Sequence, residues 1–419
     1  SQRYELDMEA KQKFLYGEAV GHLFYFQAIR KEWFYAMNNP DQLIAERGSF
    51  DEDTWGWNFK VRQTPGPVRL GFGLEGNYYG YGGLTYNYLN PAYVAKPFPT
   101  SMSGLKNAQK LHGGFVDAAV PFAKYFELYL GLRYDNYDSA PQNISASGSP
   151  IKYLQGLRTD AMSPKSTLTI RPTDTTEMYL GANFNTRFPS LPEFYWFGAG
   201  YQTPGRTTNS VLHPEFGMQY EAGVTQKLPY NAQIKVRTYY YDINDYIRTV
   251  FGFRPSRVIY NLNLAQFTGV EVETQIALPY NLTPYANFTW QKTSTSPDPL
   301  NGNIRDLPEL PEYKGHIGVK YNVPNGFEAK IYVRLLSARA QPTALVNATT
   351  NTVTGVYLGK MNGFATVNLE GKYPIIQCCG GFTGSLYFGV QNLFSQNYQE
   401  DFGYPMPTAT MYGGVQARF

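Results

Sequence analysis

The sequence predicts an all-β chain that folds as a transmembrane antiparallel β-barrel. Three observations support this: apolar and polar residues alternate along many short segments, aromatic residues are abundant, and short connections alternate with long ones. Aromatic residues make up 16% of the 419 residues, with 36 Tyr and 27 Phe. Tyrosine and tryptophan suit a water–lipid boundary, because the apolar ring lies in the bilayer while the polar tip reaches the headgroups.

The composition argues against several other classes of protein. The chain has no run of about 18 apolar residues, which a transmembrane helix requires, whereas a spanning strand needs only about 9–11 residues, half of them polar. A net charge of +3 with scattered basic residues argues against nucleic acid as a partner. None of the four histidines has metal-ligand spacing or a nucleophile motif beside it. We therefore expect neither an enzyme nor an intrinsic cofactor.

Period-two alternation is clearest in the C-terminal half of the chain. In "FATVNLEGKY", Ala365, Val367 and Leu369 share one face, while Thr366 and Asn368 share the other. The segments "AQIKVRTYYY", "GVEVETQIAL" and "FEAKIYVRLL" repeat the pattern. A soluble sandwich would show the same alternation, with the apolar face in the core instead of in lipid. Connection lengths must decide between the two.

Connection lengths favour the barrel. The short connections carry turn chemistry or are too brief for anything except a hairpin, and they are "LYGE", "TPGP", "FAKY", "RPTDTT", "LPYN" twice and "VPNG". The long connections are rich in Gly, Pro, Asn, Ser and aromatics, and they are residues 78–111, 134–162, 185–216, 291–313 and 337–361. Tight turns on one rim and long loops on the other are typical of outer-membrane barrels, whose turns face the periplasm.

The chain ends in "MYGGVQARF", which reads as a final strand. If it descends to the periplasmic rim, its lipid-facing residues are Met411, Gly413, Val415, Ala417 and Phe419. Tyr412, Gln416 and Arg418 then face the lumen, and Phe419 belongs to the periplasmic aromatic girdle.

The strand count raises the question of completeness. About seventeen strands can be counted, whereas bacterial single-chain barrels have even numbers and both termini in the periplasm. The first strand, "RYELDMEAKQKF", would start at the outer rim. We therefore expect that residues 1–419 are an outer-membrane barrel lacking its first strands. The opening "SQRYELDMEA" has no signal peptide, so the chain is expected to be mature or a fragment.

Five segments, in order and covering residues 177–419, resemble the barrel of TonB-dependent receptors. They are "NTRFPSLPEFYW", "QYEAGVTQKL" with "VRTYYYDINDYI", "YNLNLAQFTGVEVETQIAL", "LPELPEYKGHIGVKY", and "GVQNLFSQNYQEDFGYPMP" with "GGVQARF". One departure is Pro407-Thr408-Ala409, where family members usually have Pro-Gly-Arg. The N-terminal third matches only in its pattern.

The resemblance implies a barrel of twenty-two strands filled by an N-terminal plug, although neither a plug nor a TonB box is seen in this sequence. It implies energised import of a scarce nutrient across the outer membrane of a Gram-negative bacterium, most commonly a ferric siderophore, with haem or cobalamin as alternatives. The implied partners are the TonB complex, acting through the plug, the nutrient chelate, lipopolysaccharide and outer-membrane lipid. A terminal Phe419 resembles the signal read by the barrel-assembly machinery.

Aromatic and arginine residues of the outer segments are candidate ligand contacts, because aromatic faces and guanidinium groups suit a large, flat, often anionic chelate. The candidates are Tyr79, Tyr81, Arg187, Phe194, Tyr195, Trp196, Arg206, Phe251 and Arg254, with Arg248 in the same group as the last two. The alternative is that these residues form the outer aromatic belt and that the arginines pair with lipopolysaccharide phosphates.

Other polar residues have simpler interpretations. His213 is expected to be a solvated loop residue, with contact to haem or a metal as the alternative. Cys378 and Cys379 are expected to be reduced cysteines of a periplasmic turn, with a vicinal disulfide or a redox role as the alternative. The charges expected in the lumen form a lattice that would hold a plug or be solvated by pore water, and they are Lys235, Arg237, Glu271, Glu273, Lys330, Arg334 and Glu370. A passive porin is the main competing function, and an adhesin or secretion pore is a further alternative.

Overall fold

The structure is a computed structural model. It describes residues 2–418 except 37–38, 83–84, 89–100, 103–105, 142–144, 147–148, 151–155, 192, 194–211, 253–256, 301, 303, 325, 347–352 and 378–382. It describes the backbone alone at residues 30–36, 39–51, 81–82, 85–88, 101–102, 106–107, 140–141, 145–146, 149–150, 251–252, 257–258, 344, 346, 353–354, 377, 383 and 418.

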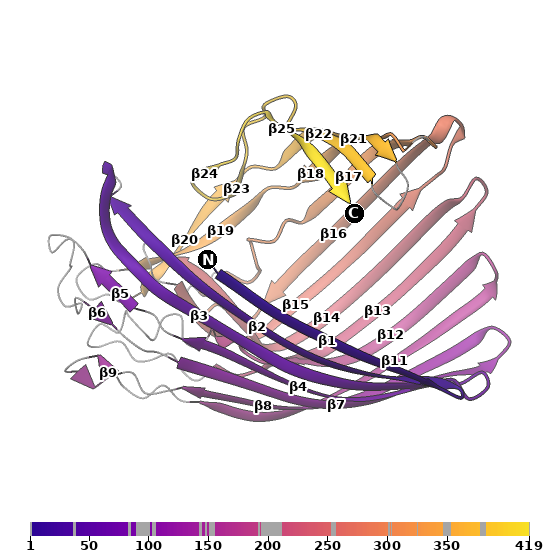
Figure 1. The fold of residues 1–419 in the computed structure, drawn as a ribbon, viewed down its shortest axis with the longest axis horizontal. Coiled ribbons are helices and arrows are strands. Elements are labelled where there is room, and N and C mark those ends of the chain that lie inside the picture. Colours follow the sequence, from indigo (N-terminus) through magenta and orange to yellow (C-terminus); the bar gives the residue numbers. More distant parts are fainter. Residues whose placement is uncertain are drawn as a thin grey trace.

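One antiparallel sheet of seventeen long strands forms the wall, and each strand pairs with the next one along the chain (Figure 1). These strands are β1 (Gln2–Phe14), β2 (Gly17–Ala36), β3 (Asn39–Gln63), β4 (Arg69–Gly82), β7 (Lys106–Ala123), β8 (Phe126–Pro141), β11 (Leu157–Thr173), β12 (Thr176–Arg187), β13 (Glu215–Leu228), β14 (Ala232–Gly252), β15 (Arg257–Gln275), β16 (Leu282–Thr295), β17 (Tyr313–Asn322), β18 (Glu328–Leu336), β21 (Phe364–Gln377), β22 (Thr383–Gln391) and β25 (Thr410–Arg418).

Smaller elements lie in the connections. They are β5 (Thr85–Tyr88), β6 (Ser101–Met102), β9 (Ser145–Ala146), β10 (Ser149–Pro150), β19 (Arg339–Val346), β20 (Val353–Met361), β23 (Gln399–Asp401), β24 (Tyr404–Pro405) and the 3₁₀ turn η2 (Pro279–Asn281). Among the described residues, no helix is long and apolar enough to cross a membrane.

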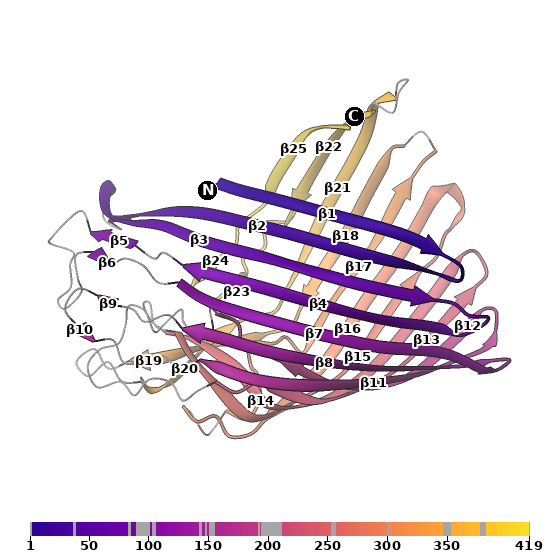
Figure 2. The same cartoon turned by 60° about the horizontal axis from the view of Figure 1, so that its bottom comes forward.

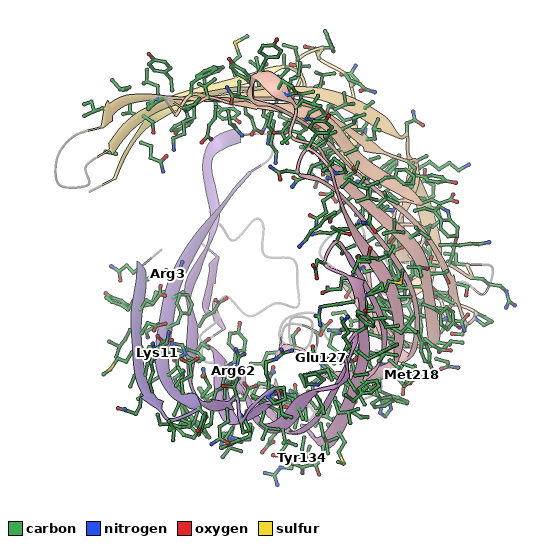
Figure 3. All side chains as sticks on the ribbon, turned by 90° about the vertical axis from the view of Figure 1, so that its right-hand side faces the viewer. Arg3, Lys11, Arg62, Glu127, Tyr134 and Met218 are labelled. Carbon is green, nitrogen blue, oxygen red and sulfur yellow. The ribbon has the colours of Figure 1, made fainter. Side chains whose placement is uncertain are left out.

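The sheet curls around a central axis and remains open between its first and last strands (Figure 3). Within the described residues, β1 pairs only with β2, and β25 pairs only with β22. The wall therefore has two free edges. The sequence-based expectation of an all-β antiparallel barrel wall is confirmed, and the described residues form no separate plug domain.

The two rims differ as the connection lengths predicted (Figure 2). Tight turns join β1 to β2 at residues 15–16 and β13 to β14 at residues 229–231, and Tyr16, Tyr230 and Asn231 have positive φ there. The opposite rim carries the long connections, but they are shorter than the sequence suggested. β8 continues to Pro141 and β11 begins at Leu157, so strand pairing extends well into the expected loop.

The outward face of the wall is apolar between two aromatic belts. On β8, Leu130 and Leu132 are 51% and 40% exposed, and Tyr134 at the outer end points outward in Figure 3, as does Met218 of β13. Phe126 lies eight residues from Tyr134, at the short-turn rim. Eight residues span roughly 26 Å along a strand, or about 20 Å of height at a tilt of about 40°, which is close to the apolar band of about 25 Å in outer-membrane barrels.

The predicted orientation of the last strand is confirmed for its described residues. Directly paired residues share one face, so the outward face at Met218 can be followed through the sheet to Met411, which lies opposite Val390. Met411 and Val415 are 79% and 70% exposed on this face. The predicted girdle position of Phe419 lies outside the described residues.

Candidate functional site

Ion pairs and tyrosines line the inner face of the wall. Arg237 contacts Glu271 at 2.9 Å and Glu221 at 3.8 Å across three neighbouring strands. Lys330 contacts Glu370 at 2.8 Å, and the Tyr332 hydroxyl donates to the same carboxylate at 2.9 Å. Cross-strand pairing brings these residues together because each occupies a lumen-facing position of its strand.

The same arrangement recurs near the first strands of the wall. Arg133 of β8 contacts Glu75 and Asp135, and its Nε donates to Asp135 at 2.7 Å. Arg62 and Glu127 point into the lumen in Figure 3. The predicted lattice of lumen charges is thus paired, including Lys235 with Glu273 at 3.9 Å. Its role in holding a plug remains a prediction.

A β-hairpin of the outer rim reaches across the mouth of the wall. β18 pairs directly with β21, so the intervening β19 and β20 leave the wall as a separate hairpin. β19 then pairs in parallel with the outer end of β14, at Phe251 with Thr343 and at Gly252 with Ala344. Because β15, β16 and β17 lie between β14 and β18 in the wall, the hairpin bridges strands that are not neighbours.

The connection between β16 and β17, residues 296–312, is held by a buried ionic cluster. Arg248 donates from Nη1 to Asp298 at 2.8 Å and from Nη2 to Glu309 at 3.4 Å. The Tyr260 hydroxyl donates to Asp298 at 2.8 Å. The side chains of Arg248 and Asp298 are 1% and 0% exposed. A buried charge requires such partners, since desolvation without them costs several kcal/mol, of order 5, per ion.

Apolar side chains are also buried at the outer ends of β14 and β15 and in the connection. Leu212, Ile247 and Ile259 form a buried cluster, and Ile304 and Leu307 of the connection are 5% and 2% exposed. The cluster joins the outer ends of β14 and β15 to the end of the 188–214 connection.

A cavity of about 170 Å³ lies where these outer segments meet β19, β20 and β23. It is lined by Thr249, Glu309, Arg339, Gln341, Pro342, Met361, Glu400 and Asp401. The Arg334 guanidinium donates to Glu400, which lowers the pKa of that carboxyl below its ordinary value. Burial raises the pKa of Glu309, against the opposing effect of Arg248. The cavity thus presents hydrogen-bond donors and carboxylate acceptors together.

The wall has a lumen lined by ion pairs, tight turns on one rim and folded connections over the other. One family of known proteins matches this chain. The family profile described as "TonB dependent receptor-like, beta-barrel" matches residues 2–393. The chain belongs to this family. TonB-dependent receptors are transporters of the Gram-negative outer membrane and not enzymes.

Solved structures of TonB-dependent receptors share the fold. The copper transporter OprC is 18% identical with a TM-score of 0.78, over 99% of this chain and 65% of its own. The unliganded ferric citrate transporter FecA is 16% identical with a TM-score of 0.69, over 99% and 61%. The ferric yersiniabactin uptake receptor FyuA from Yersinia pestis is 16% identical with a TM-score of 0.69, over 100% and 61%.

The chain thus spans less than two thirds of the length of these TonB-dependent receptors. A search of curated proteins found no match.

The TonB-dependent receptor motif "NTRFPSLPE" has a structural explanation. Arg187 donates to Glu193 at 3.0 Å and to Glu215 at 2.6 Å, and Glu193 accepts from the Ser190 backbone at 2.7 Å. The Tyr137 hydroxyl donates to the Pro189 carbonyl at 2.6 Å. The motif therefore turns the chain inward at the end of β12 and fastens it to neighbouring strands.

The predicted ligand contacts fall into three groups. Tyr79 lies on β4 opposite Thr54 and Gln109, on the same face as the lumen residue Glu75, and Arg187 is held by two carboxylates. Arg248 is buried in its ionic cluster and is not presented to a ligand. Tyr81 and Phe251 lie on β4 and β14 with only their backbones described, while Phe194, Tyr195, Trp196, Arg206 and Arg254 lie outside the described residues. Their ligand role stays a prediction.

Other candidates add no metal site. His213 exchanges two backbone hydrogen bonds of 2.9 Å with the Asn261 side chain and is exposed. No group of three or more potential metal-ligating side chains occurs in the part of the chain that the structure describes. Cys378 and Cys379 lie outside that part. Sequence reasoning missed the cavity residues Glu309 and Glu400, because they come from separate connections and carry no local motif.

Proposed function

We propose that this chain is the barrel of a TonB-dependent receptor that imports a metal chelate, a ferric siderophore in the first instance, across the bacterial outer membrane. The observation that carries this proposal is the family match over residues 2–393. A polar lumen whose outer mouth is bridged by the β19–β20 hairpin is consistent with capture of a ligand from outside, followed by passage along the wall.

The chelate class rests on the neighbours and on the outer cavity. The solved relatives are described as a copper transporter, a ferric citrate transporter and a ferric yersiniabactin receptor. A cavity of about 170 Å³ is smaller than the roughly 300–1,000 Å³ of ligand pockets, so it would hold one polar arm of a chelate. Arg339 and Gln341 would donate to that arm, and Asp401 would accept from it. Haem and cobalamin remain the alternatives within the family.

We propose that the complete wall contains further strands and encloses a plug. Unpaired backbone groups are not tolerated in the hydrocarbon of a bilayer, and β1 and β25 each have a free edge within the described residues. The proposed partners are TonB, acting through the plug, and the barrel-assembly machinery, acting on the strand that ends at Phe419. Lipopolysaccharide would surround the outward face in the outer membrane.

The test is uptake by the full-length receptor in Gram-negative cells that lack their own receptors, with and without TonB. Radiolabelled ferric chelates, haem and cobalamin are offered separately. We expect TonB-dependent uptake of a ferric chelate. Uptake that does not require TonB, together with steady ion conductance in planar bilayers, would support the porin alternative. Uptake of only cobalamin or only haem would support the transport function but contradict the proposed ferric substrate.

A matched pair of variants tests the outer cavity. Arg339→Ala removes a donor from the cavity, whereas Arg69→Ala removes an exposed arginine at the periplasmic end of β4 that contacts Glu127. We expect Arg339→Ala to weaken chelate binding by about tenfold or more, as loss of a charge-assisted hydrogen bond does, and Arg69→Ala to leave it unchanged. Equal chelate affinity of the two variants would show that the cavity does not bind the chelate.

A further inference from the structure

The lumen face of three neighbouring strands, β17, β18 and β21, carries more basic than acidic residues. Cross-strand pairing places five bases on this face, and we call them the basic column: Lys314, Lys320, Lys330, Arg334 and Lys372. The face is the lumen face because Lys314 lies opposite Thr289, which lies opposite the lumen residue Glu271. The acidic residues of these strands on the same face are Glu328 and Glu370. This part of the lumen therefore has a net positive charge.

Carboxylates neutralise only part of the basic column. Lys330 contacts Glu370 at 2.8 Å, and Arg334 contacts Glu400 of the outer connection. Within the described residues the other three bases form no ion pair, and they are Lys314, Lys320 and Lys372. Three positive charges are therefore available to an anion in the lumen.

Two cations of the basic column lie directly opposite each other. Lys320 of β17 pairs with Lys330 of β18 on the same face. Directly opposed like charges destabilise a strand pair, so strand pairing alone does not favour this arrangement. Lys320 Nζ lies 4.8 Å from the centroid of the Tyr285 ring, and Lys330 Nζ lies 4.5 Å from that of Tyr332. The rings hold the two cations near the wall without neutralising their charge.

The basic column extends along most of the wall. Its outermost level is Lys314 opposite Leu336, and its level nearest the periplasm is Lys372 opposite Glu328. These levels are eight residues apart on β18, which is roughly 26 Å along the strand. Successive levels are two or four residues apart, or roughly 7–13 Å. An anion that moves along these strands would therefore meet a cation at every level.

The outer end of the basic column adjoins the outer cavity. Arg334 contacts Glu400, and Glu400 lines the cavity together with Arg339. Lys314 lies one level farther out than Arg334 on the neighbouring strand. An anion that leaves the cavity toward the lumen would therefore meet the column at its outer end.

The lumen face of β13, β14 and β15 has a different balance of charge. Arg237 contacts Glu221 at 3.8 Å and Glu271 at 2.9 Å, and Lys235 contacts Glu273 at 3.9 Å. These bases already have acidic partners, so an anion near them would also meet carboxylates. The basic column is therefore the more favourable surface for a negatively charged solute.

We propose that the basic column is the surface along which an anionic chelate passes from the outer cavity toward the periplasm. Passage requires attraction that is distributed over several weak sites, so that a solute can enter each level and leave it again. This inference rests on the proposed transport function and adds to it the negative charge of the cargo. An acidic face of a plug, packed against the column, is the other occupant that the charges would suit, and the test distinguishes the two.

The test compares how fast two thiol reagents of opposite charge reach the basic column. The full-length receptor is expressed in Gram-negative cells that contain TonB, with Cys378 and Cys379 changed to serine. Thr283→Cys then places one thiol opposite Lys320. The reagents are the anionic sulfonatoethyl methanethiosulfonate and the cationic trimethylammonioethyl methanethiosulfonate.

Thr225→Cys is the matched control position. Thr225 lies between Glu177 and Lys235 on the lumen face, so the charges beside it are balanced. We expect the ratio of the anionic to the cationic labelling rate to be higher at Thr283→Cys than at Thr225→Cys by about fivefold or more, because several cations act on the reagent at once.

Charge variants show whether the basic column causes this preference. Lys314→Gln combined with Lys320→Gln should lower the ratio at Thr283→Cys to the control value. Lys60→Gln combined with Lys165→Gln removes two lumen lysines of β3 and β11 and should leave the ratio unchanged. The two pairs make the same change of charge in different parts of the lumen.

Thr289→Cys, opposite Lys314, repeats the measurement at the outer level of the column, and heat-modifiable migration on gels identifies folded protein. Equal ratios at the column and control positions would overturn the proposal. Absence of labelling at both column positions would also overturn it, since a plug would then cover the column. Either result can occur while the uptake assay still shows TonB-dependent import, so the proposed function and this inference can fail separately.

Discussion

Arg248 shows how one residue determines the shape of an outer connection. Its guanidinium is buried between Asp298 and Glu309, and both carboxylates belong to residues 296–312. The arginine itself lies on β14, so these two contacts attach the connection to the wall by charge. Arg248 and Asp298 are fifty positions apart, so no local sequence motif predicts their contact.

We expect Asp298→Asn to loosen the connection between β16 and β17. Asparagine keeps the shape but removes the charge, which leaves Arg248 to pair with Glu309 at 3.4 Å. Removing one partner of a buried pair costs about 3–5 kcal/mol. Limited proteolysis should cleave within residues 296–312 faster than in the parent. As a control, Glu5→Gln breaks an exposed pair with Arg3 and should not change the cleavage rate. Equal rates for both variants would contradict the attachment.

Asn392 organises the connection that leads into the last strand. Its side chain accepts from the Gln396 backbone at 2.9 Å and donates to the carbonyls of Gln396 and Pro407 at 2.9 and 3.2 Å. Its own backbone N–H donates to Asn368 at 3.0 Å, and its φ is 51°. The asparagine of the "NLFSQNY" segment is therefore both a left-handed turn residue and a hydrogen-bonding clamp.

Two substitutions separate these roles. Asn392→Ala loses the side-chain hydrogen bonds and keeps a Cβ in the left-handed region, whereas Asn392→Gly loses the same hydrogen bonds and also removes the Cβ. We expect both substitutions to lower the melting temperature of the folded barrel. The free energy of unfolding should be about 1 kcal/mol lower for the alanine variant than for the glycine variant. Circular dichroism during heating measures this. If alanine matched the parent, the side-chain hydrogen bonds would contribute nothing to stability.

At the scale of the elements, the strands were predictable because each has one face toward lipid and one toward the lumen. That contrast produces the period-two alternation, which together with the barrel prediction from connection lengths predicts that Met411 and Val415 face outward and Tyr412 inward. The outer ends of β8 and β11 were missed because both faces meet water beyond the bilayer, so the alternation is lost. The cavity was missed for a different reason. Glu309, Arg339 and Glu400 meet only after three connections have folded.

The pairing of β22 with β25 depends on a tyrosine lying over a glycine. A Cβ at Gly389 would collide with the Tyr412 ring, whereas a Cβ at Gly413 would meet only the Tyr387 carbonyl oxygen at 3.3 Å. We expect Gly389→Ala to destabilise the strand pair by about 1–3 kcal/mol, as overpacking does, and Gly413→Ala to have a smaller effect.

The unfolding temperature on heat-modifiable gels compares these variants. Adding Tyr412→Ala to Gly389→Ala should make the double variant no less stable than Tyr412→Ala alone, since the collision is then absent. Additive losses would show that the ring and the glycine act independently.

At the scale of the whole molecule, the free edges of β1 and β25 limit the stability of the wall. β1 has thirteen residues, and within the described residues only one of its two edges is paired. In hydrocarbon, a strand edge must be paired, because each unsatisfied backbone group costs several kcal/mol, of order 2–7. We therefore do not expect an open sheet of these seventeen strands, with a gap between β1 and β25, to be a stable membrane-spanning unit by itself.

We expect strands outside residues 1–419 to fill this gap, pairing with β1 on one side and β25 on the other. The intact denatured mass of the protein purified from its native outer membrane should then exceed 47.4 kDa, which is the mass of these residues alone. Cysteines introduced at Met8 and Val415, with Cys378 and Cys379 changed to serine, test the alternative directly. A disulfide within one chain would mean that β1 and β25 pair with each other, and a disulfide between chains would mean that a second copy closes the wall. With strands in between, neither forms, because the bridged Cα atoms must lie within about 7 Å.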